Sequence, residues 1–152
     1  MTVEKRTHFD KSAEKVIGLV DFGGCEDEKD RDKLGDHVLV VMFQPFKGKY
    51  VQALGAFLSA GPVTSQKLHK IIIESTALLE KSRYLVDCVS IDTATWNRTM
   101  WDLFGINAEN PCCEHPVDPS RRLRFTCDFP HLIKSLWVRI LDKKYLNVSE
   151  KK

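Results

Sequence analysis

The sequence has no long apolar segment, no secretory leader and no excess of one charge. Its longest wholly apolar run extends only from Val38 to Phe43, whereas a membrane-spanning helix needs about 20 apolar residues. The first residues are charged and lack an apolar stretch, so no signal peptide is expected. Lys and Arg number 23 against 21 Asp and Glu, which excludes a histone-like basic coat. These absences predict an intracellular protein, nuclear or cytoplasmic, with no membrane partner.

The cysteines do not form the pattern of a disulfide framework. Five are present, whereas a secreted framework normally has an even number in a shorter chain. Reduced thiols therefore fit the sequence better. The 152 residues, with 43% hydrophobic and 29% charged side chains, match one globular domain that can hold its own core. We expect this domain over residues 1–141 and a polar tail over residues 142–152.

The order of local patterns predicts an α/β fold. Apolar runs bounded by turn residues predict strands at Glu4–Asp10, Lys15–Phe22, His37–Phe46, Tyr50–Ser59, Leu85–Ile91 and Leu123–Cys127. Helical periodicity and capping residues predict helices at Thr64–Arg83, Thr95–Phe104 and Pro130–Leu141. The remaining segments Gly23–Asp36 and Asn107–Pro119 are expected to be loops. Strands followed by alternating helices and strands give a mixed sheet with flanking helices, the order of ribonuclease H-like folds.

One predicted strand lacks the usual alternation of apolar and polar residues. The stretch His37–Phe43 reads HVLVVMF, and a continuous apolar run of this kind is typical of a strand buried on both faces. We therefore expect it to lie inside the sheet.

Three apolar strands end in aspartate, at Asp21, Asp92 and Asp128. Carboxylates at strand ends can converge at one edge of a sheet. Two or three such groups suit Mg²⁺, which prefers oxygen ligands, and paired metals assist phosphodiester chemistry. Aspartate is equally typical of turns and helix N-caps, and both Asp92 and Asp128 precede predicted helices. Spacing alone leaves both roles open, with capping the commoner.

Two thiol-based alternatives have weaker support. Cys112, Cys113 and His115 could form a zinc site with Cys127 or His131, but the paired C-x₂-C and H-x₃₋₅-H spacings of structural zinc sites are missing. Cys127 with His131 could form a nucleophile pair, yet no oxyanion motif lies beside them. Ordinary loop and helix-start residues are the commoner interpretation of both.

The most basic stretch extends from Arg121 to Lys144 and includes Phe125, Phe129 and Trp137. Basic residues interspersed with aromatic ones can bind the phosphates and bases of nucleic acids. A solvated surface with core aromatics is the more common meaning of such a stretch. The sequence leaves both interpretations open.

Two blocks resemble the motifs of a known family. Residues 88–101, CVSIDTATWNRTMW, are similar to the valine–serine–aspartate … asparagine–arginine … tryptophan block of P-element-type transposases, the family that includes the THAP-domain transposases. Residues 125–134, FTCDFPHLIK, resemble the aspartate–x–proline–histidine–leucine–x–lysine block of that family. The order of the other segments also agrees, so the resemblance extends over about residues 1–141.

The resemblance implies the N-terminal part of a ribonuclease H-like catalytic domain. In that family an Asp-Asp-Glu set holds two Mg²⁺ ions for DNA cleavage and joining, and the DNA partner is the transposon end. Asp92 matches the second aspartate of the set, which implies a catalytic, metal-binding role. Asp21 is the nearest substitute for the first aspartate. The other matched positions, to which the resemblance assigns no role, are Asn97, Arg98, Asp128, His131 and Lys134.

The resemblance also implies a fold that is incomplete at both ends. In the family, the first aspartate lies in an Asp-Glu-Met block at the position of Met1, and the final glutamate lies beyond a nucleotide-binding insertion that begins near Pro130. We therefore expect a chain that is inactive by itself. The alternative is a non-catalytic, transposon-derived module that binds DNA or a protein through the Arg121–Lys144 stretch, and self-association is also open.

Overall fold

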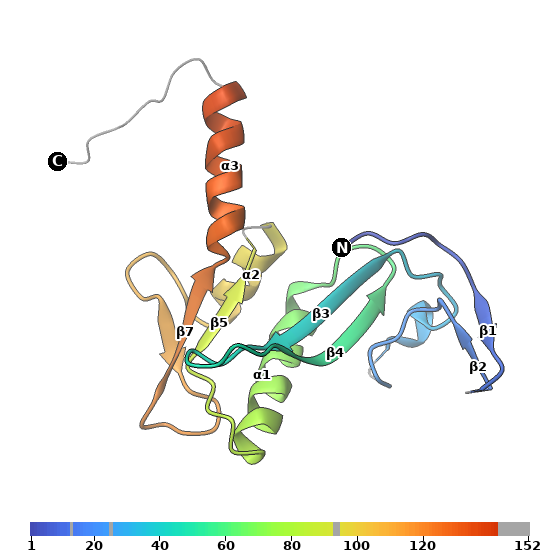
Figure 1. Ribbon diagram of the computed structural model, residues 1–152, viewed down its shortest axis with the longest axis horizontal. Helices are drawn as coiled ribbons and strands as arrows, with labels where there is room; N and C mark the ends of the chain where they lie inside the picture. Colours follow the sequence, from blue (N-terminus) through green and yellow to red (C-terminus); the bar gives the residue numbers. More distant parts are fainter. Residues whose placement is uncertain (13, 25, 93–94, 143–152) are drawn as a thin grey trace. The chain divides into compact units, whose positions relative to one another are not determined.

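A computed structural model describes residues 1–12, 14–24, 26–92 and 95–142, with the side chains of Lys15, Thr95, Trp96 and Asn97 left out. The chain divides into two compact units, an N-terminal unit, Met1–Thr64, and a C-terminal unit, Ser65–Lys152 (Figure 1). Each unit is described by itself. The predicted single domain over residues 1–141 stays a prediction.

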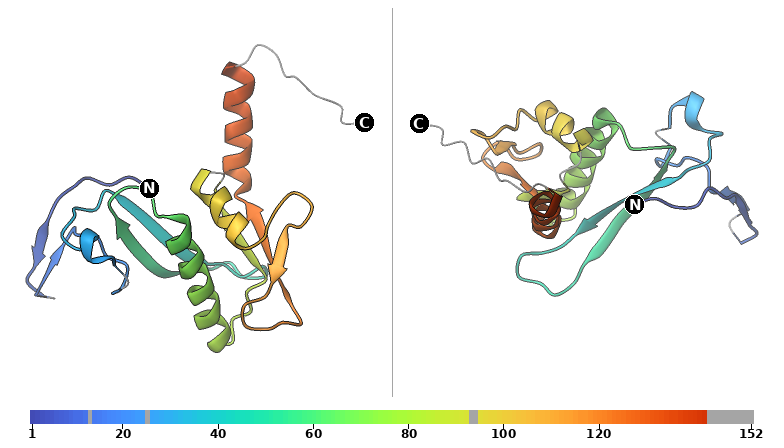
Figure 2. Two further views of the ribbon diagram at one scale, coloured as in Figure 1. Left: turned by 180° about the vertical axis from the view of Figure 1, so that it is seen from behind. Right: turned by 90° about the horizontal axis from the view of Figure 1, so that it is seen from above.

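The N-terminal unit consists of two antiparallel strand pairs. β1 (His8–Asp10) pairs with β2 (Lys15–Ile17), and β3 (His37–Phe43) pairs with β4 (Gln52–Ser59) (Figure 2). A β-bulge lies between Val41 and Met42. The predicted loop between the pairs is largely exposed and contains one 3₁₀ turn, η1 (Glu28–Asp30).

The first two strands are shorter than predicted. The backbone of Gly18 has a φ of +106°, and a Cβ there would clash with the carbonyl oxygen of Arg6. This left-handed conformation ends β2 after Ile17, because it departs from the extended backbone of a strand. Beyond it, Leu19 and Asp21 form only isolated bridges.

The prediction that the HVLVVMF strand is buried on both faces was wrong. Val40 is 41% exposed and Met42 is 62% exposed. The reason is that β3 belongs to a two-stranded sheet, in which alternate side chains turn to opposite faces and one face stays open. The buried apolar side chains of this unit are instead Val20 and Phe22, whose ring lies 6.1 Å from that of Phe57.

The C-terminal unit combines helices with a mixed sheet. Its helices are α1 (Ser65–Lys81), α2 (Thr95–Leu103) and α3 (Phe129–Asp142). Its strands are β5 (Cys88–Ile91), β6 (Cys112–Glu114) and β7 (Arg122–Cys127), in the spatial order β5-β7-β6. β5 runs parallel to β7, and β6 runs antiparallel to it. The predicted α/β class is therefore confirmed, although β6 lies in a segment predicted to be a loop.

Alternation along β7 separates a buried face of this sheet from an open one. Leu123 and Phe125 are buried, whereas Arg122 and Arg124 are exposed. The buried face meets the helices: Met100 of α2 is fully buried, and α1 adds Leu68, Ile71 and Ile72.

α3 continues away from the end of β7 and contributes no buried residue (Figure 1). Eight of its apolar side chains are between 38% and 69% exposed, Trp137 among them at 62%. None of the helices in residues 1–142, as far as these are described, is both long and apolar enough to cross a bilayer.

We expect the stability of the N-terminal unit to fall in acid through Asp36. Its carboxylate bonds the His37 ring at 2.7 Å, the Gly61 N–H at 2.6 Å and Lys5 at 3.0 Å, and these contacts hold its pKa far below the usual range. The unfolded chain then binds more protons than the folded one, so stability is full above about pH 5 and declines below about pH 4. Urea midpoints at pH 6 and pH 3 measure this change.

Asp36→Asn should flatten that pH dependence, since no carboxylate remains to titrate. The matched control is Asp32→Asn in the exposed loop, which should keep the wild-type slope. Equal slopes for both variants would contradict the assignment to Asp36.

Candidate functional site

Two aspartates meet at one edge of the C-terminal unit's sheet. β5 and β7 are parallel and Ile91 lies opposite Cys127, so Asp92 and Asp128 occupy the next matched positions. The Asp128 N–H donates to the Ile91 carbonyl at 2.7 Å, which fixes the two strand ends side by side. Neighbouring strands lie about 4.8 Å apart, so the backbones of Asp92 and Asp128 are neighbours at this edge.

Asp128 also occupies the N-cap position of α3. Its carbonyl accepts the Leu132 N–H at 2.9 Å, and its carboxylate lies 3.9 Å from Nε2 of His131. The side chains of Asp128 and His131 are 42% and 57% exposed, so solvent screens their attraction and the pair stabilises the fold little. The capping position and a ligand role are compatible, because the carboxylate remains accessible.

The other predicted positions are less constrained by the structure. Asp92 is exposed, and residues 93–94 that follow it lie outside the described residues. Asn97 lies in α2, with its side chain outside the described part. Arg98 is exposed on the same helix, and Lys134 is exposed on α3.

Asp21 belongs to the N-terminal unit, whereas Asp92 belongs to the C-terminal unit. Its backbone forms an isolated bridge with Leu58, and its Oδ1 accepts the Gly23 N–H at 2.9 Å. That bond is the aspartate turn typical of a chain reversal. A metal-binding role for Asp21 stays a prediction.

The chemistry of the Asp92–Asp128 edge fits Mg²⁺. Mg²⁺ usually keeps several waters and binds proteins through one or two carboxylates. Both side chains here are hard oxygen donors and both are solvent-accessible. Within the described ranges, no group of three or more His, Cys, Asp or Glu side chains is arranged around a common point.

The structure does not bring the candidate zinc ligands Cys112, Cys113 and His115 together. Cys112 and Cys113 are successive residues of β6, whose side chains turn to opposite faces of the sheet. His115 is fully buried, and both ring nitrogens already have partners. Its Nδ1 accepts the Val117 and Asp118 N–H groups, which leaves Nε2 to donate to the Val86 carbonyl at 3.0 Å. His115 is therefore a structural residue.

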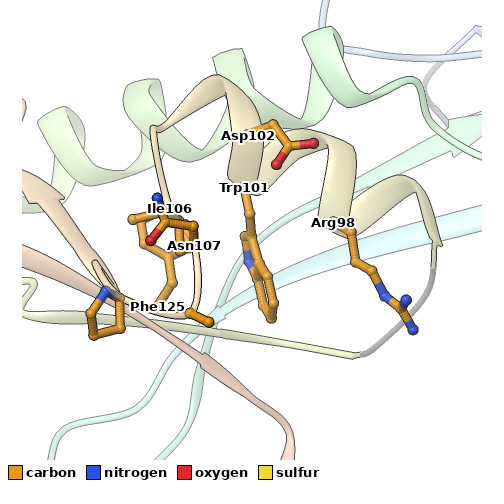
Figure 3. Close-up of a pocket in the computed structure, with 8 residues that line it drawn as sticks. Arg98, Trp101, Asp102, Ile106, Asn107 and Phe125 are labelled. Atoms are coloured by element: carbon orange, nitrogen blue, oxygen red, sulfur yellow. The ribbon is translucent and has the colours of Figure 1, made fainter. Parts of the chain in front are cut away.

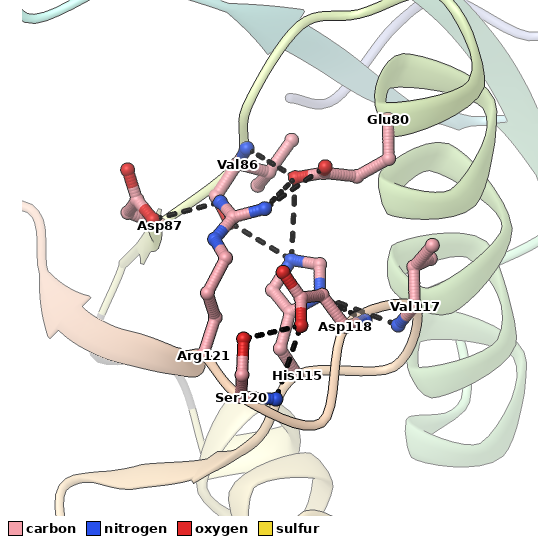
Figure 4. Close-up of polar contacts among 8 residues, drawn as sticks. All are labelled: Glu80, Val86, Asp87, His115, Val117, Asp118, Ser120 and Arg121. Atoms are coloured by element: carbon pink, nitrogen blue, oxygen red, sulfur yellow. Dashed lines mark hydrogen bonds and ion pairs between the residues drawn. The ribbon is translucent and has the colours of Figure 1, made fainter.

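An ion-pair network centred on Glu80 was not found from the sequence (Figure 4). The Glu80 side chain is 8% exposed, and Nη1 of Arg121 donates to both of its oxygens at 2.9 Å. The Val86 N–H donates to the same carboxylate at 2.7 Å. Burial raises the pKa of Glu80, but the Val86 N–H and the Arg121 guanidinium outweigh burial and lower it overall.

This network fastens the segment before β5 to the segment before β7. Nη2 of Arg121 also donates to Asp87 at 2.8 Å and to the Val86 carbonyl at 3.3 Å. Asp87 directly precedes β5 and Arg121 directly precedes β7, so the network aligns the two strands that carry Asp92 and Asp128. Arg121 is thus engaged internally, contrary to its placement in a solvated or phosphate-binding stretch.

Comparison with known proteins gives one family and one fold. Residues 1–105 match the family described as TNP-like, RNase H N-terminal domain. The structure is similar to a chain of the Drosophila P element transposase strand transfer complex, with a TM-score of 0.70 and 22% sequence identity. That match covers 94% of this chain and 28% of the other. A search of curated proteins gave no match.

Proposed function

The chain belongs to the TNP-like RNase H N-terminal domain family, and from that premise we propose that it forms the N-terminal part of a P-element-type transposase catalytic domain. Its role there is to contribute to Mg²⁺-dependent cleavage and transfer of DNA strands at transposon ends. The observation that carries the proposal is the parallel pairing of β5 and β7, which places Asp92 beside Asp128 at one sheet edge.

Asp92 and Asp128 are the residues that would hold the metal. Bound Mg²⁺ supplies Lewis-acid stabilisation of charge on phosphodiester oxygens. Asp92 provides the carboxylate that matches the family motif, and Asp128 provides a second one on the neighbouring strand.

We propose further that the 152-residue chain does not cut DNA alone. Of the three carboxylates that the family resemblance implies, this sequence matches one, Asp92. Asp128 provides a second carboxylate beside it, and the Asp21 carboxylate accepts the Gly23 N–H in an aspartate turn. Incubation of the purified chain with Mg²⁺ and transposon-end DNA should therefore give no cleaved or joined product.

A second candidate function is DNA binding without chemistry, favoured by the open face of the sheet. Arg122 and Arg124 are both exposed there, two residues apart on β7. Phosphate contacts of this kind weaken with rising salt and carry no sequence preference. Under this proposal, Arg122→Met with Arg124→Met abolishes binding of duplex DNA, whereas Asp92→Asn leaves it intact.

Manganese, a paramagnetic substitute for Mg²⁺, tests the proposed metal site directly. Substoichiometric Mn²⁺ should broaden the backbone NMR signals around Asp92 and Asp128 before all others, because the ion relaxes nearby nuclei. Asp92→Asn should reduce this broadening severalfold. The matched control is Asp118→Asn, near the opposite end of β7, where an asparagine side chain can keep the hydrogen bonds to Ser120.

Broadening centred on the acidic Glu26–Asp32 loop, or unchanged in Asp92→Asn, would contradict the metal-binding proposal. Cleavage of DNA by the isolated chain would contradict only the statement that it is inactive alone. The metal-binding proposal and the statement that the chain is inactive alone can therefore be tested independently with the same variants.

A further inference from the structure

A pocket lies between α2, the segment after it and β7 in the C-terminal unit (Figure 3). Its volume is about 370 Å³, within the range of about 300–1,000 Å³ typical of small-molecule sites. Apolar walls come from Ile106, Pro111 and Phe125. Polar groups come from Arg98, Trp101, Asp102 and Asn107. No step proposed above uses this pocket.

The indole of Trp101 carries an unsatisfied donor in this pocket. Its Nε1 atom is buried and has no hydrogen-bond partner among the described residues. Indole N–H can only donate, and buried polar groups are nearly always paired. Figure 3 shows the indole extending away from α2, with Ile106, Asn107 and Phe125 to one side of it. An acceptor atom of a bound molecule would supply the missing partner.

Two other polar side chains of the pocket, those of Asn107 and Arg98, are donors as well. Oδ1 of Asn107 accepts the backbone N–H groups of Glu109 at 2.9 Å and Asn110 at 2.8 Å, which leaves its amide nitrogen to donate. Arg98 is exposed beside Trp101 and forms no ion pair with another described residue. In Figure 3 the Asp102 carboxylate points away from the indole. The pocket therefore favours a flat, apolar molecule that is rich in acceptors and negatively charged at one end.

We propose that this pocket binds a nucleotide. An acceptor on the edge of the base takes the Trp101 N–H, the base lies against Pro111 and Phe125, and the phosphate pairs with Arg98. A free nucleotide and a nucleotide within a DNA strand share this chemistry. If the nucleotide belongs to a DNA strand, the inference rests on the proposed function. If the nucleotide is free, the inference does not depend on the proposed function.

The indole N–H signal of Trp101 in a ¹⁵N NMR spectrum reports on this site. The full chain is titrated with deoxyadenosine, with deoxyadenosine monophosphate and with a short single-stranded oligo-deoxyadenosine. The Trp101 signal is assigned as the one that is missing from the spectrum of Trp101→Phe. We expect all three ligands to shift the Trp101 signal. Arg98→Met should weaken the monophosphate about tenfold or more and leave the nucleoside unchanged, since it removes a charge-assisted hydrogen bond.

Arg83→Met is the matched control, because Arg83 is an exposed arginine after α1 in the same unit and does not line the pocket. It should leave the affinity for both small ligands at the wild-type value. A Trp101 signal that none of the ligands moves overturns the proposal, and so does equal weakening of monophosphate binding by Arg98→Met and Arg83→Met. Tighter binding of the oligonucleotide than of the monophosphate identifies DNA as the source, and the reverse identifies a free nucleotide. Failure of the manganese test leaves this result unaffected.

Discussion

Arg121→Met is expected to lower the free energy of unfolding of the C-terminal unit by about 3–5 kcal/mol, the usual cost of removing one partner of a buried ion pair. The variant leaves the Glu80 carboxylate, 8% exposed, without the two 2.9 Å bonds from Nη1. The Val86 N–H still donates to Glu80, which places the expected loss in the lower half of this range. Urea denaturation followed by far-UV circular dichroism measures it.

Two further variants separate the ion pair from the loss of a surface charge. Arg122→Met removes the neighbouring, exposed arginine and should change stability by no more than about 0.5 kcal/mol. Combining Arg121→Met with Glu80→Leu removes both charges and should recover most of the loss, because an apolar pair of similar size often replaces a buried ion pair without cost. Equal losses of unfolding free energy in Arg121→Met and Arg122→Met would contradict the prediction, because they would mean that water, and not Arg121, satisfies the Glu80 carboxylate.

The sequence could not reveal this network, for a physical reason. Arg121 is 41 residues from Glu80, and it stands beside Arg122 and Arg124 in a stretch that is basic throughout. Local patterns describe which face of a helix or strand is apolar, but they do not specify which distant residue lies opposite. Only the tertiary contact between the end of α1 and the segment before β7 separates Arg121 from its neighbours.

Long, regular elements were predictable and short ones were not. The helical period placed α1 within two residues at each end, because its apolar positions recur over four turns. β6 has only three residues, CCE, and its strand conformation depends on pairing with β7. The continuous apolar run of β3 indicated burial that the two-stranded sheet does not provide.

The candidate site was predictable in part. Strand-end positions and the family motif both indicated Asp92. The proximity of Asp128 depends on the parallel register of β5 and β7, which no local pattern encodes. Trp101 belongs to the same family motif, but the motif assigned it no role. The structure shows that its Nε1 atom is buried in a pocket without a hydrogen-bond partner among the described residues.

Leu123→Ala should destabilise the C-terminal unit by about 2–5 kcal/mol, the range for truncating a buried leucine. Leu123 lies on the buried face of β7 and is fully buried, so the substitution leaves a cavity. The same change at Leu136 of α3 should cost less than about 0.5 kcal/mol. Leu136 is 48% exposed, and alanine is the better helix former.

The pair of leucine variants also tests whether α3 is uncovered in solution. An exposed leucine that loses its side chain forfeits few contacts, so a small effect at Leu136 means that water reaches this helix face. A loss at Leu136 as large as that at Leu123 would mean that another protein surface covers α3, through self-association or otherwise. Repeating the urea midpoints at two protein concentrations distinguishes these cases, because stability that comes from association rises with concentration and stability that comes from the core does not.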